Sequence, residues 1–261
     1  GYADNFLNAK PILDRYSVPA TVFISTGNVD SAREFWWDDL ERLILNSGTL
    51  PEKIQLKVDE ADYEWELGDT AYYDESESSI YADWNVLDKQ DPTPRHQFYR
   101  SLCKILLPLP SSEQSSVLNQ LYSLSKKTSE GRLSFRALSS DQVHSLSESG
   151  LVEIGAHTVT HPQLSKLSEA EQGKEIKKSK NKLSELLDRS VVSFAYPYGT
   201  RTDYTSDTVS IVHQAGFDCA CSNFSGVVKS STDKFQLPRM LVRNWSKDEF
   251  VSRLRYLFSR G

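Results

Sequence analysis

The sequence predicts an α/β fold in which a barrel-like domain is interrupted by a large α+β insertion. Two observations predict the barrel-like domain: continuous apolar runs typical of buried parallel strands recur along it, and helical segments separate these runs. A third observation, a change of pattern over residues 31–133, predicts the insertion. The apolar runs are VPATVFIST (18–26), LVEIGAH (151–157), VVSFAYPYG (191–199) and FDCACSNF (217–224).

Helices are predicted between the strands from apolar residues at helical spacing and from capping residues. A Ser-x-x-Glu capping box begins the long charged helix at 168–188. Ser139 or Ser140 caps the helix at 139–150, and Gly150 ends it. The predicted helices of this domain cover residues 3–16, 139–150, 168–188, 205–216 and 246–260.

The insertion combines helices with a hairpin. KIQLKV and DYEWEL alternate apolar and polar residues around a short turn, as the strands of a β-hairpin do. Residues 69–95 are polar, acidic and rich in tyrosine, so we expect an irregular loop whose acidic run DESESS lies in solvent. The predicted helices cover residues 33–48, 96–109 and 111–127. We therefore assign 1–30 and 134–261 to the barrel-like domain and 31–133 to the insertion.

Composition excludes several classes of function. The net charge of −6 and the pI near 5.5 argue against a broad phosphate-binding surface, so we expect no nucleic-acid partner. Three cysteines do not make a disulfide framework, which favours a reducing compartment. Cys219 and Cys221 are expected to be core residues. No apolar run reaches the roughly 18 residues that a membrane-spanning helix needs.

Two histidines follow a predicted strand directly. His157 ends the run LVEIGAH, and the tight turn TVT returns His161 to its side. The carboxyl ends of parallel strands are where barrel and doubly wound enzymes place their sites. Imidazole nitrogens bind zinc-like metals, and catalytic sites combine two or three protein ligands with water. The spacing also fits a structural pair, with His157 bonded to a loop carbonyl and His161 exposed before Pro162.

The turn Pro197-Tyr198-Gly199 ends the next predicted strand. Backbone amides in such a turn can point at a developing oxyanion. The alternative is an ordinary turn in which the Tyr198 ring packs over the end of the barrel.

These motifs occur in a recognisable order: GYADN with VPATVFISTG, then EIGAHTVTHPQLSKLS, FAYPYG and LPRMLVRNW. In this combination the chain resembles the NodB-homology polysaccharide deacetylases, carbohydrate esterase family 4, over residues 1–30 and 134–245. The resemblance implies a distorted (β/α) barrel of the polysaccharide deacetylase type. It also implies divalent-metal-dependent hydrolysis of N-acetyl or O-acetyl groups on chitin-like chains, peptidoglycan or other polysaccharides.

The resemblance assigns roles to residues that match its motifs. His157 and His161 would be ligands of the metal, which we expect to be zinc, with cobalt and nickel as alternatives. The backbone N–H of Tyr198 would be the oxyanion donor, and Pro197 and Gly199 would shape that turn at the substrate.

The chain also departs from the family pattern. The family motif T-F-D-D-G-Y holds the general base and the third metal ligand, and here Gly1 and Tyr2 match its tail. Both aspartates are therefore expected immediately upstream of Gly1, and a polypeptide that starts at Gly1 is expected to bind metal weakly and to be inactive. By register, Asp4 belongs to the following helix. Ala195 stands where the family has arginine. From its side-chain chemistry, Arg239 is a candidate to orient the base, and the alternative is a surface or structural arginine. The general acid is unassigned.

The insertion contains Trp36, Trp37, Trp65 and Trp84, four of the five tryptophans. Aromatic faces stack on sugar rings, so Trp37 is a candidate substrate contact. The helical spacing of FWWDDLERLIL favours the alternative, in which these rings form an apolar seam of the insertion.

Together these features predict a metal-dependent enzyme that removes acetyl groups, in particular N-acetyl groups, from a polysaccharide or oligosaccharide in bacterial surface-glycan biosynthesis. A small-amide hydrolase of the same fold and a catalytically inactive glycan-binding module are the alternatives. We expect a cytoplasmic or cell-envelope location, with the cytoplasm favoured.

Overall fold

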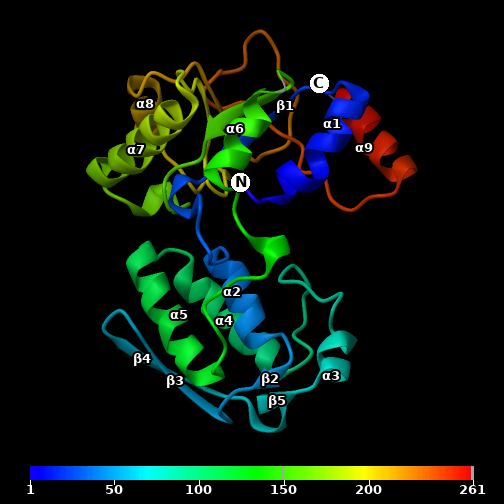
Figure 1. The fold of residues 1–261 in the computed structure, drawn as a ribbon, viewed down its shortest axis with the longest axis vertical. Helices are drawn as coiled ribbons and strands as arrows, with labels where there is room; N and C mark the ends of the chain where they lie inside the picture. The colour runs from blue at the N-terminus through cyan, green and yellow to red at the C-terminus, as the bar shows by residue number, and fades with distance from the viewer. Residues whose placement is uncertain (149, 260–261) are drawn as a thin grey trace. The chain divides into compact units, whose positions relative to one another are not determined.

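The structure is a computed structural model that describes residues 1–148 and 150–259 (Figure 1). The predicted helices at 139–150 and 246–260 include residues 149 and 260, which lie outside the described residues. The chain folds as two compact units. The first comprises Gly1, residues 3–29 and the chain from Leu138 onward, and the second comprises Tyr2 and residues 30–137. The role of the second unit as an insertion in a deacetylase barrel stays a prediction.

The first unit is built on a parallel sheet with the strand order β1-β6-β7-β8. Each strand falls inside its predicted apolar run, and the predicted α/β fold class is confirmed. Closure of this sheet into a barrel stays a prediction. The strands are β1 (Ala20–Ile24), β6 (Val152–Ala156), β7 (Ser193–Ala195) and β8 (Cys219–Cys221).

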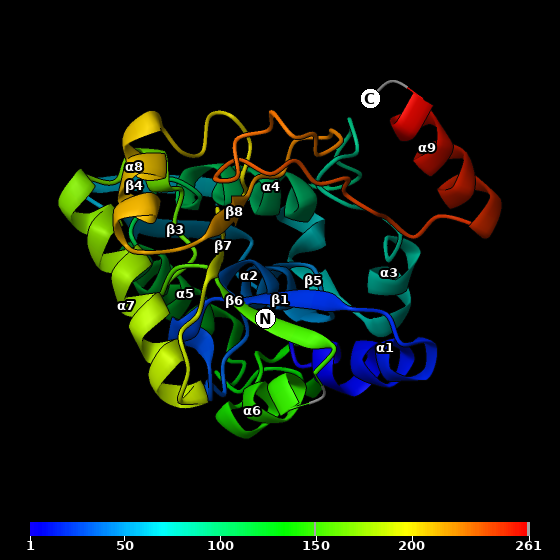
Figure 2. The ribbon, with the colours of Figure 1, turned by 90° about the horizontal axis from the view of Figure 1, so that it is seen from above.

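Helices α6, α7 and α8 bury apolar side chains in the core of the first unit, whereas α1 and α9 bury no residue completely. The predicted capping box of α7 is confirmed, because Ser168 and Glu171 cap each other's backbone. Helices α7 and α8 lie side by side (Figure 2) and bury Ile176, Leu183 and Val212 in the core. The helices are α1 (Lys10–Tyr16, after a π-helical turn at Asn5–Ala9), α6 (Ser140–Glu148), α7 (Glu169–Leu187), α8 (Ser206–Gln214) and α9 (Lys247–Ser259).

The second unit packs three helices together and against a hairpin (Figure 1). Its core includes Leu40 and Leu43 from α2, Leu102 from α4, Leu121 from α5 and Ile54 from the hairpin. The predicted hairpin and the predicted helices of this unit are confirmed. The elements are α2 (Trp36–Ile44), β2 (Gly48–Thr49), β3 (Lys53–Val58), β4 (Ala61–Glu66), β5 (Tyr72–Tyr73), α3 (Glu75–Ile80), α4 (Pro94–Leu106) and α5 (Ser111–Ser125).

The prediction of an irregular loop over residues 69–95 is wrong for much of this segment. Residues 72–73 form β5, which pairs with β2, and the acidic run begins helix α3. The Asp74 carboxylate accepts from the backbone N–H of Glu77, and the Glu77 carboxylate accepts from the backbone N–H of Asp74. Acidic side chains favour the first turn of a helix, so this run starts a helix although it has no apolar stripe.

A buried arginine joins several segments of the second unit. Arg95 is completely buried, and its guanidinium donates to five backbone carbonyls. Burial lowers the pKa of Arg95 to about 10, so it stays protonated at neutral pH. The accepting carbonyls belong to Ile44, Asn46, Gly48, Thr70 and Ala71.

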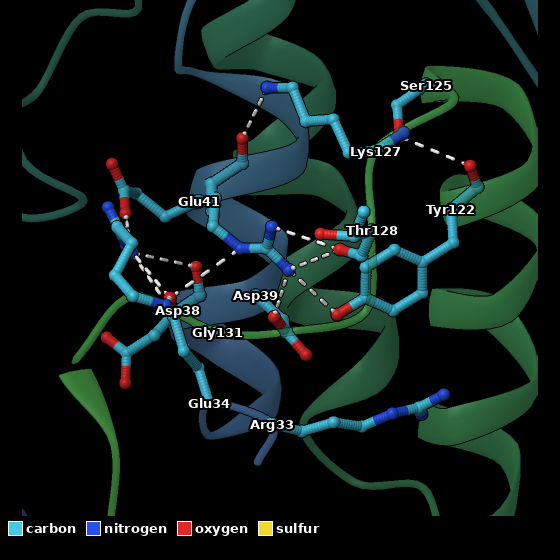
Figure 3. A network of polar contacts seen from close by, with 12 residues as sticks. Arg33, Glu34, Asp38, Asp39, Glu41, Tyr122, Ser125, Lys127, Thr128 and Gly131 are labelled. Carbon is cyan, nitrogen blue, oxygen red and sulfur yellow. Dashed lines mark hydrogen bonds and ion pairs between the residues drawn. The ribbon is translucent and has the colours of Figure 1, made fainter.

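A second polar network lies along α2 (Figure 3). Arg132 pairs with the buried Glu34 at 2.8 Å and with Glu41 at 2.7 Å, and Arg42 pairs with Asp39 at 2.9 Å and donates to the Tyr122 hydroxyl at 3.0 Å. Because an unpaired buried charge is costly, these pairs explain how α2 buries acidic and basic side chains beside its apolar ones.

Asp38 of α2 is expected to make stability depend on pH. Its carboxylate accepts from the Tyr2 hydroxyl at 2.5 Å, and burial raises its pKa from 3.8 to about 6. Since the folded-state pKa lies above the unfolded one, the stability contributed by protonated Asp38 is complete below pH 3.8 and is lost as pH rises through about 6.

The wild type should therefore lose stability relative to Asp38→Asn as pH rises. The difference in free energy of unfolding, variant minus wild type, should increase between about pH 4 and about pH 6.5 and be constant above that range. Urea unfolding at a series of pH values measures this difference. A difference that stays constant across the whole range would contradict the burial of the Asp38 carboxylate.

Candidate active site

The two histidines of the predicted site lie at the carboxyl edge of the parallel sheet, just after β6. Backbone hydrogen bonds fix this segment to the end of β1: His157 N–H donates to Ile24 O at 3.1 Å, and Gly27 N–H donates to Val159 O at 2.8 Å. The Ser25 hydroxyl also donates to His157 O at 3.0 Å. A side chain at Gly27 would place its Cβ 2.7 Å from Val159 O, so this close approach requires glycine.

The turn between the histidines reverses the chain and brings the imidazole rings together. Thr158 and His161 both adopt left-handed backbone conformations, with φ of 65° and 59°. His161 N–H donates to the Thr158 hydroxyl at 3.1 Å, which stabilises the turn. The ring centroids of His157 and His161 are 4.7 Å apart, with the ring planes at 75°.

Glu175 on α7 holds the middle of this turn. Its carboxylate accepts from the backbone N–H of Val159 at 2.8 Å and of Thr160 at 2.9 Å, and from the Thr160 hydroxyl at 3.0 Å. Sequence reasoning missed this residue. It is one of many charged residues on α7, and no motif distinguishes it.

Both imidazoles are neutral at pH 7. Burial and the neighbouring His161 hold the pKa of His157 well below its usual range, and burial lowers the pKa of His161 to about 4. His157 Nδ1 lies 2.6 Å from Ala195 O, and since a carbonyl only accepts, Nδ1 carries the proton. The lone pair of His157 is therefore on Nε2, as in metal-binding histidines whose other nitrogen donates to a carbonyl.

Gly1 packs against the end of β1, where an added Cβ would lie 3.3 Å from Ile24 Cα, and its carbonyl accepts from Leu138 N–H at 2.9 Å. Within residues 1–148 and 150–259, no three His, Cys, Asp or Glu side chains lie together as a metal site. Asp4 is exposed at the start of the π-helical turn, in agreement with its predicted register.

The turn after β7 lies next to His161. The Tyr198 ring is 4.8 Å from the His161 ring, and Tyr198 and Gly199 have φ of 58° and 69°. Asn223 holds this turn, because its side-chain amide donates to Tyr198 O at 3.0 Å and its backbone N–H donates to Gly199 O at 2.7 Å. A Cβ at Gly199 would lie 2.9 Å from Asn223 N. Sequence reasoning missed Asn223, which lies two residues after β8 without a distinguishing motif.

Residues 117–220 match the family model of the polysaccharide deacetylases. The resemblance drawn from the sequence motifs is thereby confirmed. Among curated proteins, none matches this chain.

Several solved deacetylase structures are similar to this chain. The de-N-acetylase from Aggregatibacter actinomycetemcomitans is 12% identical, with 97% of this chain and 71% of that chain covered and a TM-score of 0.50, which shows a shared fold. The BpsB deacetylase domain from Bordetella bronchiseptica is 14% identical, with coverage of 93% and 68% and a TM-score of 0.49. The deacetylase PplD from Streptococcus pyogenes is 24% identical, with coverage of 45% and 50% and a TM-score of 0.41. This chain spans half of PplD.

Two further predicted site residues, Arg239 and Trp37, lie far from the histidine turn in the sequence. Arg239 donates from Nε to Ser222 O at 2.6 Å, and its charge is one of the causes that lower the pKa of His157. Trp37 belongs to the second unit, where its Nε1–H donates to the Tyr2 hydroxyl at 2.7 Å and its ring stacks on Phe35. Within the part of the chain that the structure describes, no helix is long and apolar enough to cross a membrane.

Proposed function

We propose that the protein is a metal-dependent hydrolase that removes acetyl groups, in particular N-acetyl groups, from a polysaccharide or oligosaccharide of the bacterial surface. One observation carries this proposal: His157 and His161 are in ring contact at the carboxyl edge of a parallel sheet, with a centroid distance of 4.7 Å. Two neutral imidazoles in contact are a common donor set for a catalytic divalent cation, and zinc, cobalt and nickel all accept nitrogen ligands.

The residues of the chain fit such a cation. The Ala195 carbonyl fixes the tautomer of His157, so that Nε2 is the nitrogen that would bind, and Glu175 fixes the turn that presents His161. When bound, the cation supplies polarisation of the acetyl carbonyl and a water of lowered pKa. We propose that the third ligand and the general base are aspartates that precede Gly1.

The chain itself would orient the acetyl group and stabilise developing charge. The backbone N–H of Tyr198 would donate to the oxyanion, in a turn that Pro197 and Gly199 shape for the substrate and that Asn223 holds. A preorganised donor of this kind needs no rearrangement during the reaction. Arg239, through its positive charge, would orient the aspartate base and lower its pKa.

Release of acetate by the full-length protein tests the proposal. Acetylated glycans would be incubated with the protein after EDTA treatment and after addition of zinc, cobalt or nickel, and free acetate would be measured. We expect release that requires added metal. Hydrolysis of small amides without release from any glycan would favour the small-amide alternative, and metal binding without any hydrolysis would favour a glycan-binding module.

Glu175→Ala is expected to weaken metal binding although Glu175 does not contact the proposed cation. Loss of its three hydrogen bonds frees the turn between the histidines, and loss of such supporting groups typically costs about 10–100-fold in metal affinity. Titration with a competing chelator measures the affinity. Glu185→Ala, an exposed position of the same helix, is the matched control and should bind normally. Equal affinities for both variants would show that Glu175 does not position the site.

A further inference from the structure

We propose that the second unit binds a neutral oligosaccharide in two adjoining hollows that share the rings of Tyr81 and Trp84. This site is formed within residues 30–137 and goes beyond the proposed hydrolysis at the histidine pair.

The first hollow has a volume of about 470 Å³, within the range of small-molecule sites. It lies between three parts of the second unit: α2, α4 and the segment that follows α3. Its lining includes Asn46, Tyr81, Trp84, Asn85, His96 and Tyr99. The second hollow, of about 770 Å³, is also lined by Tyr81 and Trp84. Because both hollows border the same two rings, a ligand with several rings in a row can occupy both.

Aromatic rings and amides together suit a sugar. A pyranose presents C–H groups on its faces, which pack on aromatic rings, and hydroxyls at its edge, which need hydrogen-bond partners. Trp84 and Tyr81 contact His96 edge-on, with ring centroids 4.6 Å and 5.1 Å away. Neighbouring amide and hydroxyl groups come from Asn46, Asn85 and Ser78.

His96 adds a buried polar group to the first hollow. Its side chain is 2% exposed, and Nδ1 lies 2.8 Å from the Thr93 hydroxyl, so Nε2 is the ring atom that can exchange a hydrogen bond with a ligand. Burial lowers the pKa of His96 to about 4, which keeps the ring neutral. The hollow therefore offers a polar contact to a sugar hydroxyl without adding positive charge.

The charged residues around the hollows are paired or balanced. Glu41 in the first hollow is 2.7 Å from Arg132, and Asp91 in the second is 2.7 Å from Arg100. Asp88 and Lys89 at the second hollow are exposed and opposite in sign. A charged ligand would therefore gain little electrostatic stabilisation in these hollows, so they favour a neutral ligand.

Arg100 also fixes the segment that carries Trp84. Its guanidinium carbon lies 5.3 Å from the centre of the Trp84 ring, and it donates to Asp88 O at 2.7 Å. Trp84 Nε1–H donates to Gln90 O at 3.1 Å. A ring held in this way loses little conformational freedom on binding, which favours affinity.

Calorimetric titration of the full-length protein with cellotetraose and with tetra-N-acetylchitotetraose, in EDTA, tests the proposal. We expect saturable binding of at least one probe, and Trp84→Ala should weaken it by about tenfold or more. Tyr72→Ala removes an exposed ring of the same unit that lines neither hollow, and it should bind as the wild type does. This titration measures binding and not acetate release, so the binding proposal can fail while the proposed hydrolysis stands, and the reverse.

Ala82→Arg is a second variant, because it fills the first hollow from an exposed position without removing a ring. It should also weaken binding if it folds with an unchanged circular dichroism spectrum. The proposal is overturned if neither tetrasaccharide binds saturably. It is equally overturned if binding survives in both Trp84→Ala and Ala82→Arg, or if Tyr72→Ala weakens it as much as they do.

Discussion

His157→Ala is expected to lower metal-dependent acetate release by at least about 100-fold and to abolish stoichiometric binding of zinc or cobalt. Loss of one of two protein imidazoles removes a direct donor, which should cost more than the roughly 10–100-fold that supporting groups contribute. Acetate assays at saturating metal, together with metal analysis of the dialysed protein, measure both effects.

His144→Ala is the matched control for this variant. The His144 side chain is 53% exposed on α6, where it lies 3.4 Å from Glu148. Its removal should change neither metal content nor acetate release. If His157→Ala retained its metal and its activity, the histidine pair would not be the catalytic site.

Arg95→Ala is expected to lower the free energy of unfolding by at least about 3 kcal/mol. The substitution removes one donor from five backbone carbonyls inside the second unit, of which Ala71 O keeps the N–H of Leu50 at 2.8 Å. Each buried group left unsatisfied costs about 1–3 kcal/mol before the structure relaxes. Two of these carbonyls, of Ile44 and Asn46, lie at the carboxyl end of α2, where a positive charge is favoured. Urea unfolding, followed by tryptophan fluorescence, measures the loss.

Two further variants separate the hydrogen bonds of Arg95 from its charge and bulk. Arg95→Lys keeps the charge, but a single ammonium cannot reach all five carbonyls, so most of the destabilisation should remain. Arg33→Ala removes a half-buried arginine of the same unit that donates to one side chain, and it should cost less than about 1 kcal/mol. Equal stability of Arg95→Ala and Arg33→Ala would contradict this account.

Local sequence signals predicted most of the elements because their physical causes are local. The run at 20–24 favours a strand because its β-branched and aromatic side chains fit an extended backbone. Ser168 and Glu171 satisfy the first amides of α7 wherever that helix lies. The contact of the two histidines was also predictable, because a short turn after a strand leaves few positions for His161 other than beside His157.

The errors and omissions fall where contacts between residues distant in sequence determine the local structure. Helix α3 was missed because it has no apolar stripe, although Asp74 and Glu77 form a capping box that could have revealed it. Glu175 and Asn223 support turns on other elements, so their own surroundings in the sequence give no signal. Arg95 resembles any charged helix residue until the fold surrounds it with carbonyls.

Anomalous diffraction from crystals of the full-length protein grown with cobalt tests the central claim most directly. The account predicts a single strong peak about 2.1 Å from one nitrogen each of His157 and His161. Cobalt bound at other residues, with no density between these two imidazoles at saturating metal, would contradict it.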